Sequence, residues 1–272
     1  MRILPLIVCL PAILAAQDPR EIVRRSVEVD QKNVELARNY TYLERDEVRI
    51  LDGSGKVKNT HTQTWDVTLL EGSSYRRLVA RNDQPLSPKE QRKEEDKLRK
   101  SIEERRNETE EQRQRRIADS ERRQERQHEP MKELPDAFDF RLVGEETLPS
   151  GEVYVIDAAP KPGYKPKLRS AAYFPKVKGR LWIDKRDYYW AKVEVETLDT
   201  ISLGGFLVRF GKGGHLMVEQ ARVNQEVWLL KGVTLRLSAR FALITGVHAE
   251  LTITFSDYKK FQVDSRVVST AQ

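Results

Sequence analysis

The chain contains 272 residues, carries a formal net charge of +6 at pH 7, and 33% of its residues are charged. This length provides for a sizeable core in one or two domains, and a single cysteine excludes a scaffold built on disulfides. The modest basic excess is compatible with attraction to an anionic membrane surface or to nucleic acid, and it establishes neither.

The N-terminal residues 1–16, MRILPLIVCLPAILAA, have the features of a secretory signal peptide. A positive Arg2 precedes a short apolar run, which two prolines interrupt, and small residues follow it. The run is too short to span a bilayer, so we expect cleavage near Ala16 and a soluble, periplasmic mature protein. Cys9 follows Val8 rather than a small residue, which argues against a lipid anchor. Export in turn argues against nucleic acid as the partner.

A helix is expected over residues 19–38. Asp18 is a suitable N-cap, Pro19 suits the first helical position, and apolar residues then recur at helical spacing. Beyond this helix the period changes to two, which is typical of half-buried strands. The pattern and its turn residues predict an antiparallel meander with strands in the segments 40–50, 56–72 and 74–83.

A highly charged insertion, residues 87–129, interrupts the strands. Between Lys89 and His128 it has 14 basic and 12 acidic residues and very few apolar ones. Ser87-Pro88-Lys89-Glu90 forms a capping box with proline at the first helical position, which predicts a helix. Asn107 and Thr109 leave open whether there is one helix or two. A solvated excursion and a docking surface are both compatible with this segment, whereas the nearly balanced charge argues against nucleic-acid binding.

The remainder of the chain again alternates with a period of two. The segment GRLWIDKRDYYWAKVEVE, residues 179–196, is typical of a hairpin around a turn at Lys185-Arg186-Asp187. About ten strands are expected in all, and a sheet of that width has to curl. The sequence therefore predicts a mainly β (α+β) fold, in which a curved antiparallel sheet accompanies an N-terminal helix and the charged helical insertion. A single domain is expected over residues 17–265, followed by a short tail at 266–272.

One face of this sheet is apolar along its length, and it is the candidate binding surface. A curved sheet with one helix in its mouth leaves room for an apolar cavity. A closed barrel filled with side chains shows the same alternation, so ordinary core packing is the alternative for each residue. The candidate lining residues are Trp65, Val67, Leu69, Leu181, Ile183, Val193, Val195, Leu235, Leu237, Leu251 and Ile253.

No sequence motif indicates catalysis, a metal or a cofactor. The four histidines, His61, His128, His215 and His248, are not spaced as metal ligands. The chain lacks a Gly-x-Ser-x-Gly nucleophile motif, and its cysteine lies in the signal segment. We therefore expect a protein that is not an enzyme and that carries no cofactor.

Two stretches, GRLWIDKRDYYWAKVEVE and LTITFSDYKKFQVD, resemble the bacterial outer-membrane lipoprotein carrier superfamily, which includes LolA-like carriers and related lipoprotein-sorting proteins. The resemblance implies an exported protein in which an antiparallel sheet, folded into a half barrel, holds acyl chains. It also places Arg45 where members of the family carry an arginine that faces the covering helices. The insertion at 88–128 departs from the family, because it is much longer than the usual loops.

Together these inferences favour an exported carrier that holds the acyl chains of a lipid or lipoprotein on the apolar face of the sheet and contacts the membrane transiently. The hydrophobic effect would drive this binding at about 25 cal/mol per Å². The alternative is an envelope interaction or regulatory protein with a filled core, which binds a protein partner through the charged helix.

Overall fold

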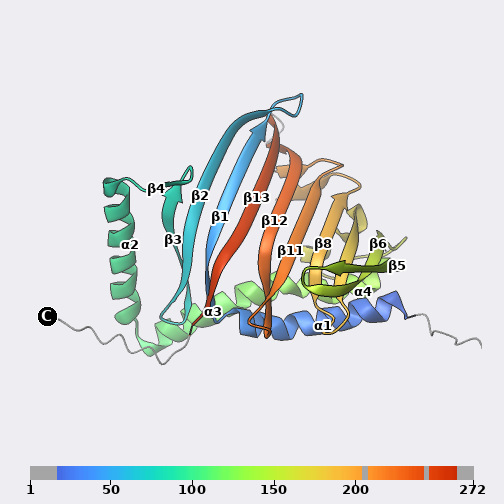
Figure 1. Cartoon of the computed structure of the whole chain (residues 1–272), viewed down its shortest axis with the longest axis horizontal. Helices are drawn as coiled ribbons and strands as arrows, with labels where there is room; N and C mark the ends of the chain where they lie inside the picture. Colours follow the sequence, from blue (N-terminus) through green and yellow to red (C-terminus); the bar gives the residue numbers. More distant parts are fainter. Residues whose placement is uncertain (1–16, 204–207, 242–244, 262–272) are drawn as a thin grey trace, which may run out of the picture.

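A computed structural model describes residues 17–203, 208–241 and 245–261 of the chain. In these residues one long antiparallel sheet carries helices along one of its sides (Figure 1). The predicted signal segment and the predicted C-terminal tail lie outside the described residues. The helices are α1 (Pro19–Ala37), α2 (Pro88–Arg106), α3 (Glu110–His128) and α4 (Leu134–Ala137), with 3-10 turns at Glu129–Glu133, Arg169–Ala171 and Phe174–Lys176.

Eleven of the thirteen described strands follow one path, in the order β4-β3-β2-β1-β13-β12-β11-β8-β7-β6-β5, and β10 and β9 branch from β12. The first long strand, β1, pairs with the last, β13, which joins the two halves of the chain in one sheet. The strands are β1 (Tyr40–Leu51), β2 (Val57–Leu70), β3 (Ser73–Arg81), β4 (Gln84–Pro85), β5 (Phe138–Leu148), β6 (Gly151–Pro160), β7 (Val177–Asp184), β8 (Trp190–Thr197), β9 (Ile201–Leu203), β10 (Val208–Phe210), β11 (His215–Val223), β12 (Val227–Phe241) and β13 (Thr245–Lys260).

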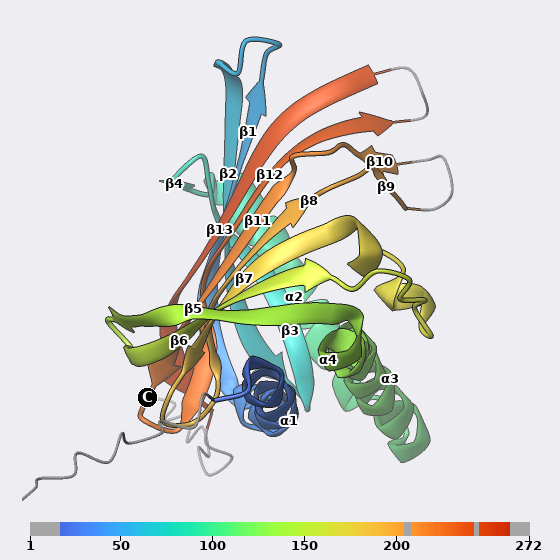
Figure 2. The ribbon, with the colours of Figure 1, turned by 90° about the vertical axis from the view of Figure 1, so that its right-hand side faces the viewer.

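The sheet bends and stays open (Figure 2). Twist accumulates with each added strand, so a sheet of this width has to curl. Its two edge strands, β4 and β5, do not pair with one another in the described part of the chain. The predicted fold class, a curved antiparallel sheet with an N-terminal helix and a helical insertion, is confirmed.

Helix α1 begins where the sequence predicts and covers the lower ends of the strands (Figure 1). The side chain of Asp18 accepts a hydrogen bond from a backbone N–H of the first turn, and Pro19 follows it. The apolar side of the helix is buried in a cluster with side chains of β5 to β8, and each large side chain buried there contributes roughly 1.5–3 kcal/mol. This cluster includes Ile22, Val23, Val27, Phe138, Tyr154, Ile156, Leu181 and Ile183.

Asn33 fixes the C-terminal half of α1 to the start of β12. Its Oδ1 accepts from the backbone N–H of Trp228 at 2.8 Å, and its Nδ2 donates to the Trp228 carbonyl at 2.8 Å. The same Nδ2 donates to the Tyr189 hydroxyl at 3.0 Å, and that hydroxyl donates to Asp30 at 3.0 Å. Because each buried polar group is costly to leave unpaired, this network selects one position of the helix on the sheet.

The charged insertion consists of two helices, which answers the question that the sequence left open. Helix α2 starts at the predicted capping box of Ser87 and Glu90. A second box, formed by Thr109 and Gln112, starts α3 after a break at Asn107. Helix α2 stands beside β3, and α3 turns back across the strand ends toward α1 (Figure 1). No residue of either helix is buried, so their stability depends on caps, ion pairs along the helix and polar contacts with the sheet.

Polar side chains attach α3 to the rest of the molecule at both of its ends. Near its start, Arg116 donates to the Ser73 hydroxyl at 2.7 Å and to the Glu71 carbonyl at 2.9 Å, both at the β2–β3 turn. At its end, His128 Nδ1 lies 2.7 Å from Asp30 Oδ2 of α1. Arg38, at the end of α1, also donates to Gln124 and Glu121, and the Ile117 side chain packs against Gly72. Helix α3 is therefore held mainly by separate polar contacts.

The contact between His128 and Asp30 predicts a pH-dependent contribution to stability. The hydrogen bond to Asp30 raises the pKa of His128 above its ordinary value of about 6.5. The contact thus stabilises the fold fully below about pH 6.5, and this stabilisation is lost as pH rises through the raised pKa. In urea unfolding at about pH 6 and about pH 9, His128→Gln should remove part of the pH dependence, by less than about 1 kcal/mol for so exposed a pair. The His61→Gln variant is the control, and an unchanged pH dependence in His128→Gln would contradict the assignment.

Candidate ligand-binding face

The strand register places apolar side chains in rows across the helix side of the sheet. Side chains directly opposite one another on neighbouring strands have Cβ atoms about 4.5–5.5 Å apart, so each row forms a continuous surface. One row, from β6 to β13, contains Ile156, Leu181, Val193, Val218, Val233 and Ile253. The next row, from β8 to β1, contains Val195, Leu216, Leu235, Leu251 and Val48.

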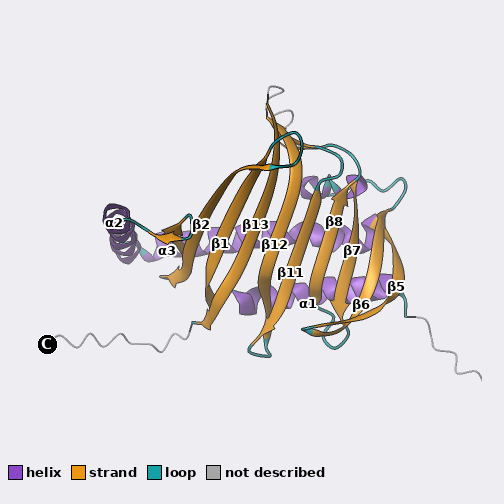
Figure 3. Cartoon of the chain, turned by 45° about the horizontal axis from the view of Figure 1, so that its top comes forward, coloured by secondary structure: helices purple, strands orange, loops and turns teal. Residues whose placement is uncertain are grey.

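The two ends of these rows differ in how they are covered. Under α1, Ile156 and Ile183 have no exposed surface and Leu181 is 4% exposed. Toward β11, β12, β13 and β1 the rows are only half-buried, and α1 crosses the lower ends of the strands (Figure 3). We call these half-buried residues the apolar face: Val48, Ile50, Val193, Val195, Leu216, Val218, Val233, Leu235, Leu237, Leu251 and Ile253.

The structure separates the eleven residues that the sequence proposed as lining into three groups. Leu181 and Ile183 belong to the buried cluster under α1. Trp65, Val67 and Leu69 lie two strands beyond β13, on β2, where Val67 is 7% exposed. Contact of any of the eleven with a ligand stays a prediction. The other six lie together on the apolar face, and two of them, Val193 and Val195, also pack against the buried cluster. The six are Val193, Val195, Leu235, Leu237, Leu251 and Ile253.

The sequence interpretation missed what β11 and β1 contribute to this face. On β1 the alternating positions Tyr42, Glu44, Asp46, Val48 and Ile50 share one side of the strand. The two acidic residues in the middle of this series hid its apolar character from a search for alternating apolar residues. On β11 the run is short, since only two of its apolar residues, Leu216 and Val218, face the helices.

The expected position of Arg45 is wrong. It alternates with the β1 residues that face the helices, so its side chain lies on the opposite face of the sheet. There it donates to both carboxylate oxygens of Asp83, at 2.7 and 2.8 Å. The residues on either side of it, Glu44 and Asp46, face the helices instead.

Four side chains from three adjacent strands form a polar group at the edge of the apolar face. We call Glu44 and Asp46 of β1, Trp65 of β2 and Arg76 of β3 the β1 polar cluster. Arg76 donates to Glu44 and, at 2.7 Å, to Asp46 Oδ2, which also accepts from Trp65 Nε1 at 3.0 Å. Burial raises the pKa of Glu44, Arg76 opposes the rise, and the neighbouring Asp46 carboxylate adds to it. Among the described residues of the two apolar rows, a ligand would therefore meet charged side chains only at this cluster.

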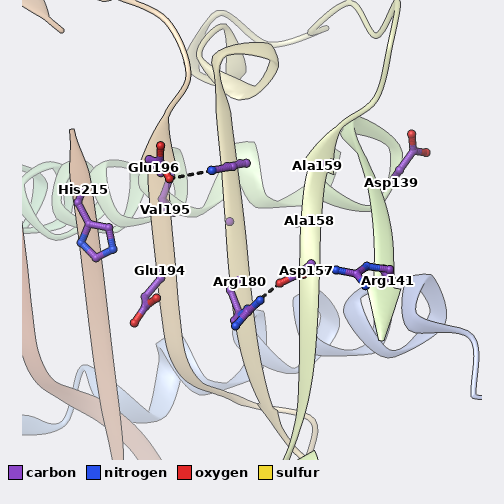
Figure 4. A pocket seen from close by; sticks show the side chains of 12 residues that line it. Asp139, Arg141, Asp157, Ala158, Ala159, Arg180, Glu194, Val195, Glu196 and His215 are labelled. Atoms are coloured by element: carbon purple, nitrogen blue, oxygen red, sulfur yellow. Dashed lines mark hydrogen bonds and ion pairs between the residues drawn. The ribbon is translucent and has the colours of Figure 1, made fainter. Parts of the chain in front are cut away.

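The opposite face of the sheet is charged and carries a shallow depression of about 440 Å³ over β5 to β11 (Figure 4). Its basic and acidic side chains pair with one another. Asp157 accepts from Arg180 at 2.6 Å and from Arg141 at 2.8 Å, and Lys178 pairs with Glu196 at 2.9 Å. The hydrogen bond from Arg180 lowers the pKa of Asp157, so this carboxylate stays ionised. The depression is therefore a solvated surface of ion pairs.

Among the described residues, no three His, Cys, Asp or Glu side chains are grouped in a way that would hold a metal ion. Within the same ranges, no helix has the length and apolar character needed to cross a membrane.

No family model matches the chain, and no curated protein matches it. Similar solved structures include a putative outer membrane lipoprotein-sorting protein domain from Vibrio parahaemolyticus, with 12% identity and a TM-score of 0.36 over 89% of this chain and 94% of that one. A DUF1329 family protein from Desulfovibrio piger has 11% identity and a TM-score of 0.32 over 91% and 95% of the two chains. A LolA superfamily protein from Nitrosomonas europaea has 10% identity and a TM-score of 0.31 over 90% and 93%.

The structural neighbours thus include LolA-superfamily and lipoprotein-sorting proteins, the group that the sequence resembles. At this identity and at TM-scores below 0.5, the likeness carries no argument about the site.

Proposed function

We propose that the protein is an exported carrier that holds acyl chains of a lipid or lipoprotein on the apolar face. The observation that supports it best is that the apolar rows of the sheet differ in burial between their two ends. The rows are fully buried beneath α1 and only half-buried over β11, β12, β13 and β1, although the side chains there are equally apolar. A contiguous apolar surface that stays partly accessible to solvent supports a site for an apolar ligand.

The size of the apolar face fits an acyl chain. It spans five adjacent strands, β8, β11, β12, β13 and β1, which corresponds to about 20 Å at the usual strand spacing. The acyl chains of one leaflet fill half of a hydrocarbon core that is about 30 Å thick, so one chain can lie across the strands. Each methylene group removed from water would contribute about 0.8 kcal/mol to binding.

Release of the ligand requires a covering element that can move. Helix α3 is the best candidate, because it has no buried residue and its attachments at Arg116 and His128 are polar. Such contacts can be broken without opening an apolar core. The N-terminal segment suggests that the carrier works in the periplasm, where it would contact the membrane transiently to load or deliver its ligand.

Native mass spectrometry of the exported and processed chain, followed by lipid extraction, tests the proposal. We expect a stoichiometric acyl-containing ligand, either carried through gentle purification or acquired from added phospholipid. A clean ligand-free mass that does not change after incubation with lipids would overturn the proposal.

Helices α2 and α3 support a second candidate, an envelope interaction protein that binds a protein partner. Their residues are unburied and highly charged, and the side chains of Arg99 and Lys100 are 71% and 77% exposed. In affinity capture from envelope extracts, charge reversal at both residues should abolish partner binding if α2 is the contact surface. Lipid binding by the same variant should stay unchanged. Charge reversal at Arg141 of β5, which is 74% exposed and lies outside the insertion, is the matched control.

A further inference from the structure

The β1 polar cluster lies at the end of an apolar row. The row that runs through Val193, Val218, Val233 and Ile253 continues directly onto Asp46, which is the residue opposite Ile253 on the neighbouring strand. A ligand that lies along this row therefore has one end against a carboxylate. An ordinary surface ion pair would lie on the opposite, wet face of the sheet.

The cluster has hydrogen-bonding capacity that its own members do not use. Asp46 Oδ2 accepts from both Arg76 and Trp65, but the buried Oδ1 of Asp46 has no hydrogen-bond partner among the described residues. The side chains of Asp46 and Glu44 are 20% and 15% exposed. An unpaired carboxylate oxygen that is shielded from water costs free energy. A ligand donor would recover it after the partly exposed Asp46 side chain turns Oδ1 toward the apolar face.

The net charge of the cluster determines whether a cationic or an anionic ligand group would bind there. Two carboxylates and one guanidinium give a formal charge of −1, and no other charged side chain shares these rows from β6 to β1. An anionic group placed here would be repelled by both carboxylates at low dielectric. A cationic donor would be attracted to them. The aromatic rings of Tyr42 and Phe255 lie beside Glu44 with their centroids 5.7 Å apart, and they provide an apolar surround for a cation.

We propose that the β1 polar cluster binds the ammonium group of a diacylated amphiphile, whose acyl chains lie on the apolar face. The inference rests on the proposed carrier function and names the head group that the same site recognises. Asp46 Oδ1 and Glu44 accept the N–H donors of the ammonium, and Arg76 and Trp65 hold Asp46 in position. The selectivity comes from charge-assisted hydrogen bonds, which are stronger than hydrogen bonds between neutral groups.

Two sources share this chemistry. The ethanolamine head group of a phospholipid carries an ammonium near two acyl chains, and so does a diacylated lipopeptide with a free amino terminus. Both present the donor within a few bonds of the glycerol backbone. The same residues would bind either, so the experiment compares them directly.

The first experiment is a competition on the exported and processed chain. The protein is incubated with vesicles that contain equal amounts of dioleoyl phosphatidylethanolamine and dioleoyl phosphatidylglycerol, separated from them, and analysed by native mass spectrometry. We expect a preference for phosphatidylethanolamine of about tenfold, as one additional hydrogen bond to a charged group provides. Asp46→Asn and Glu44→Gln should each reduce the preference severalfold while phosphatidylglycerol is still bound. Glu250→Gln, on the opposite face of β13, is the control and should keep the preference.

The second experiment separates the two sources. A dipalmitoylated lipopeptide with a free amino terminus is compared with its N-acylated counterpart, which has lost the ammonium. A preference for the lipopeptide with the free amine, abolished in Asp46→Asn, supports the proposal for lipopeptides. A preference for phosphatidylethanolamine without any preference between the lipopeptides identifies the phospholipid as the source of the ammonium group. Equal binding of both phospholipids and of both lipopeptides would overturn the head-group assignment but leave the carrier function intact. Absence of all lipid binding would overturn the carrier function itself.

Discussion

Replacing Leu237 by glutamate is expected to abolish acyl-chain binding while the protein stays folded. Leu237 lies on the apolar face and is half-buried, so its carboxylate variant can keep contact with water. The free energy of unfolding should then change by no more than about 1 kcal/mol, as is usual for partly exposed positions. An acyl chain on the same surface would have to desolvate the new charge. Its affinity should fall at least tenfold, which corresponds to about 1.4 kcal/mol.

Ile183→Glu is the matched contrast, because Ile183 also lies on the helix side of the sheet but has no exposed surface. A carboxylate in the cluster under α1 cannot reach water and has no partner, so we expect a loss of about 5 kcal/mol or more. A loss of this size equals the whole stability of many domains, so the chain should not fold. Circular dichroism and urea unfolding, combined with titration of a fluorescent fatty acid, check both variants. Unfolding of Leu237→Glu would show that the apolar face is ordinary core.

Leu181 and Leu235 show how far the sequence predicts the site. Both belong to strands that alternate with a period of two, and local pattern cannot distinguish them. One is buried and the other is half-buried because α1 crosses β7 near its lower end and leaves most of β12 uncovered. The crossing point depends on contacts between residues far apart in the chain, such as Asn33 with Trp228. The fold class could thus be predicted from local periodicity, whereas the open part of the face could not.

Glu44 and Asp46 show a different limit of sequence analysis. A polar residue in an alternating strand is normally assigned to the solvent-facing side of the sheet. For Glu44 and Asp46 this assignment gives the wrong face, because both side chains lie on the helix side. Their true orientation follows from the register of β1 with β13, which pairs Asp46 with Ile253. Local exceptions of this kind are expected at functional sites, where a residue serves binding at some cost to stability.

The sequence predicts the helices of the charged insertion but not the contacts that these helices make with the sheet. Capping boxes at Ser87 and Thr109 determine where α2 and α3 begin, because a cap acts within four residues of itself. The attachment of Arg116 to the β2–β3 turn joins residues more than forty positions apart, and no local pattern indicates it. For this reason the sequence could not distinguish a solvated excursion from a docking surface.

Asn33→Ala is expected to lower the free energy of unfolding by about 2–4 kcal/mol. The substitution leaves a buried N–H and a buried carbonyl of Trp228 without their side-chain partner, at about 1–3 kcal/mol for each group. It also removes a donor to the Tyr189 hydroxyl, which keeps its hydrogen bond to Asp30. Gln31→Ala, an exposed change in the same helix, should cost less than about 0.5 kcal/mol and controls for helix propensity.

The same variant connects the anchor of α1 to the ligand. If Asn33 determines where α1 crosses the sheet, its loss should let the helix move and expose part of the buried rows. Hydrogen exchange should then increase in α1 and at the start of β12 more than in β2 and β3, which lie farther along the sheet. Acyl-chain affinity should change together with this local opening, because the boundary between covered and open rows has moved. A variant as stable as the parent, with unchanged exchange in α1, would show that the apolar cluster alone positions the helix.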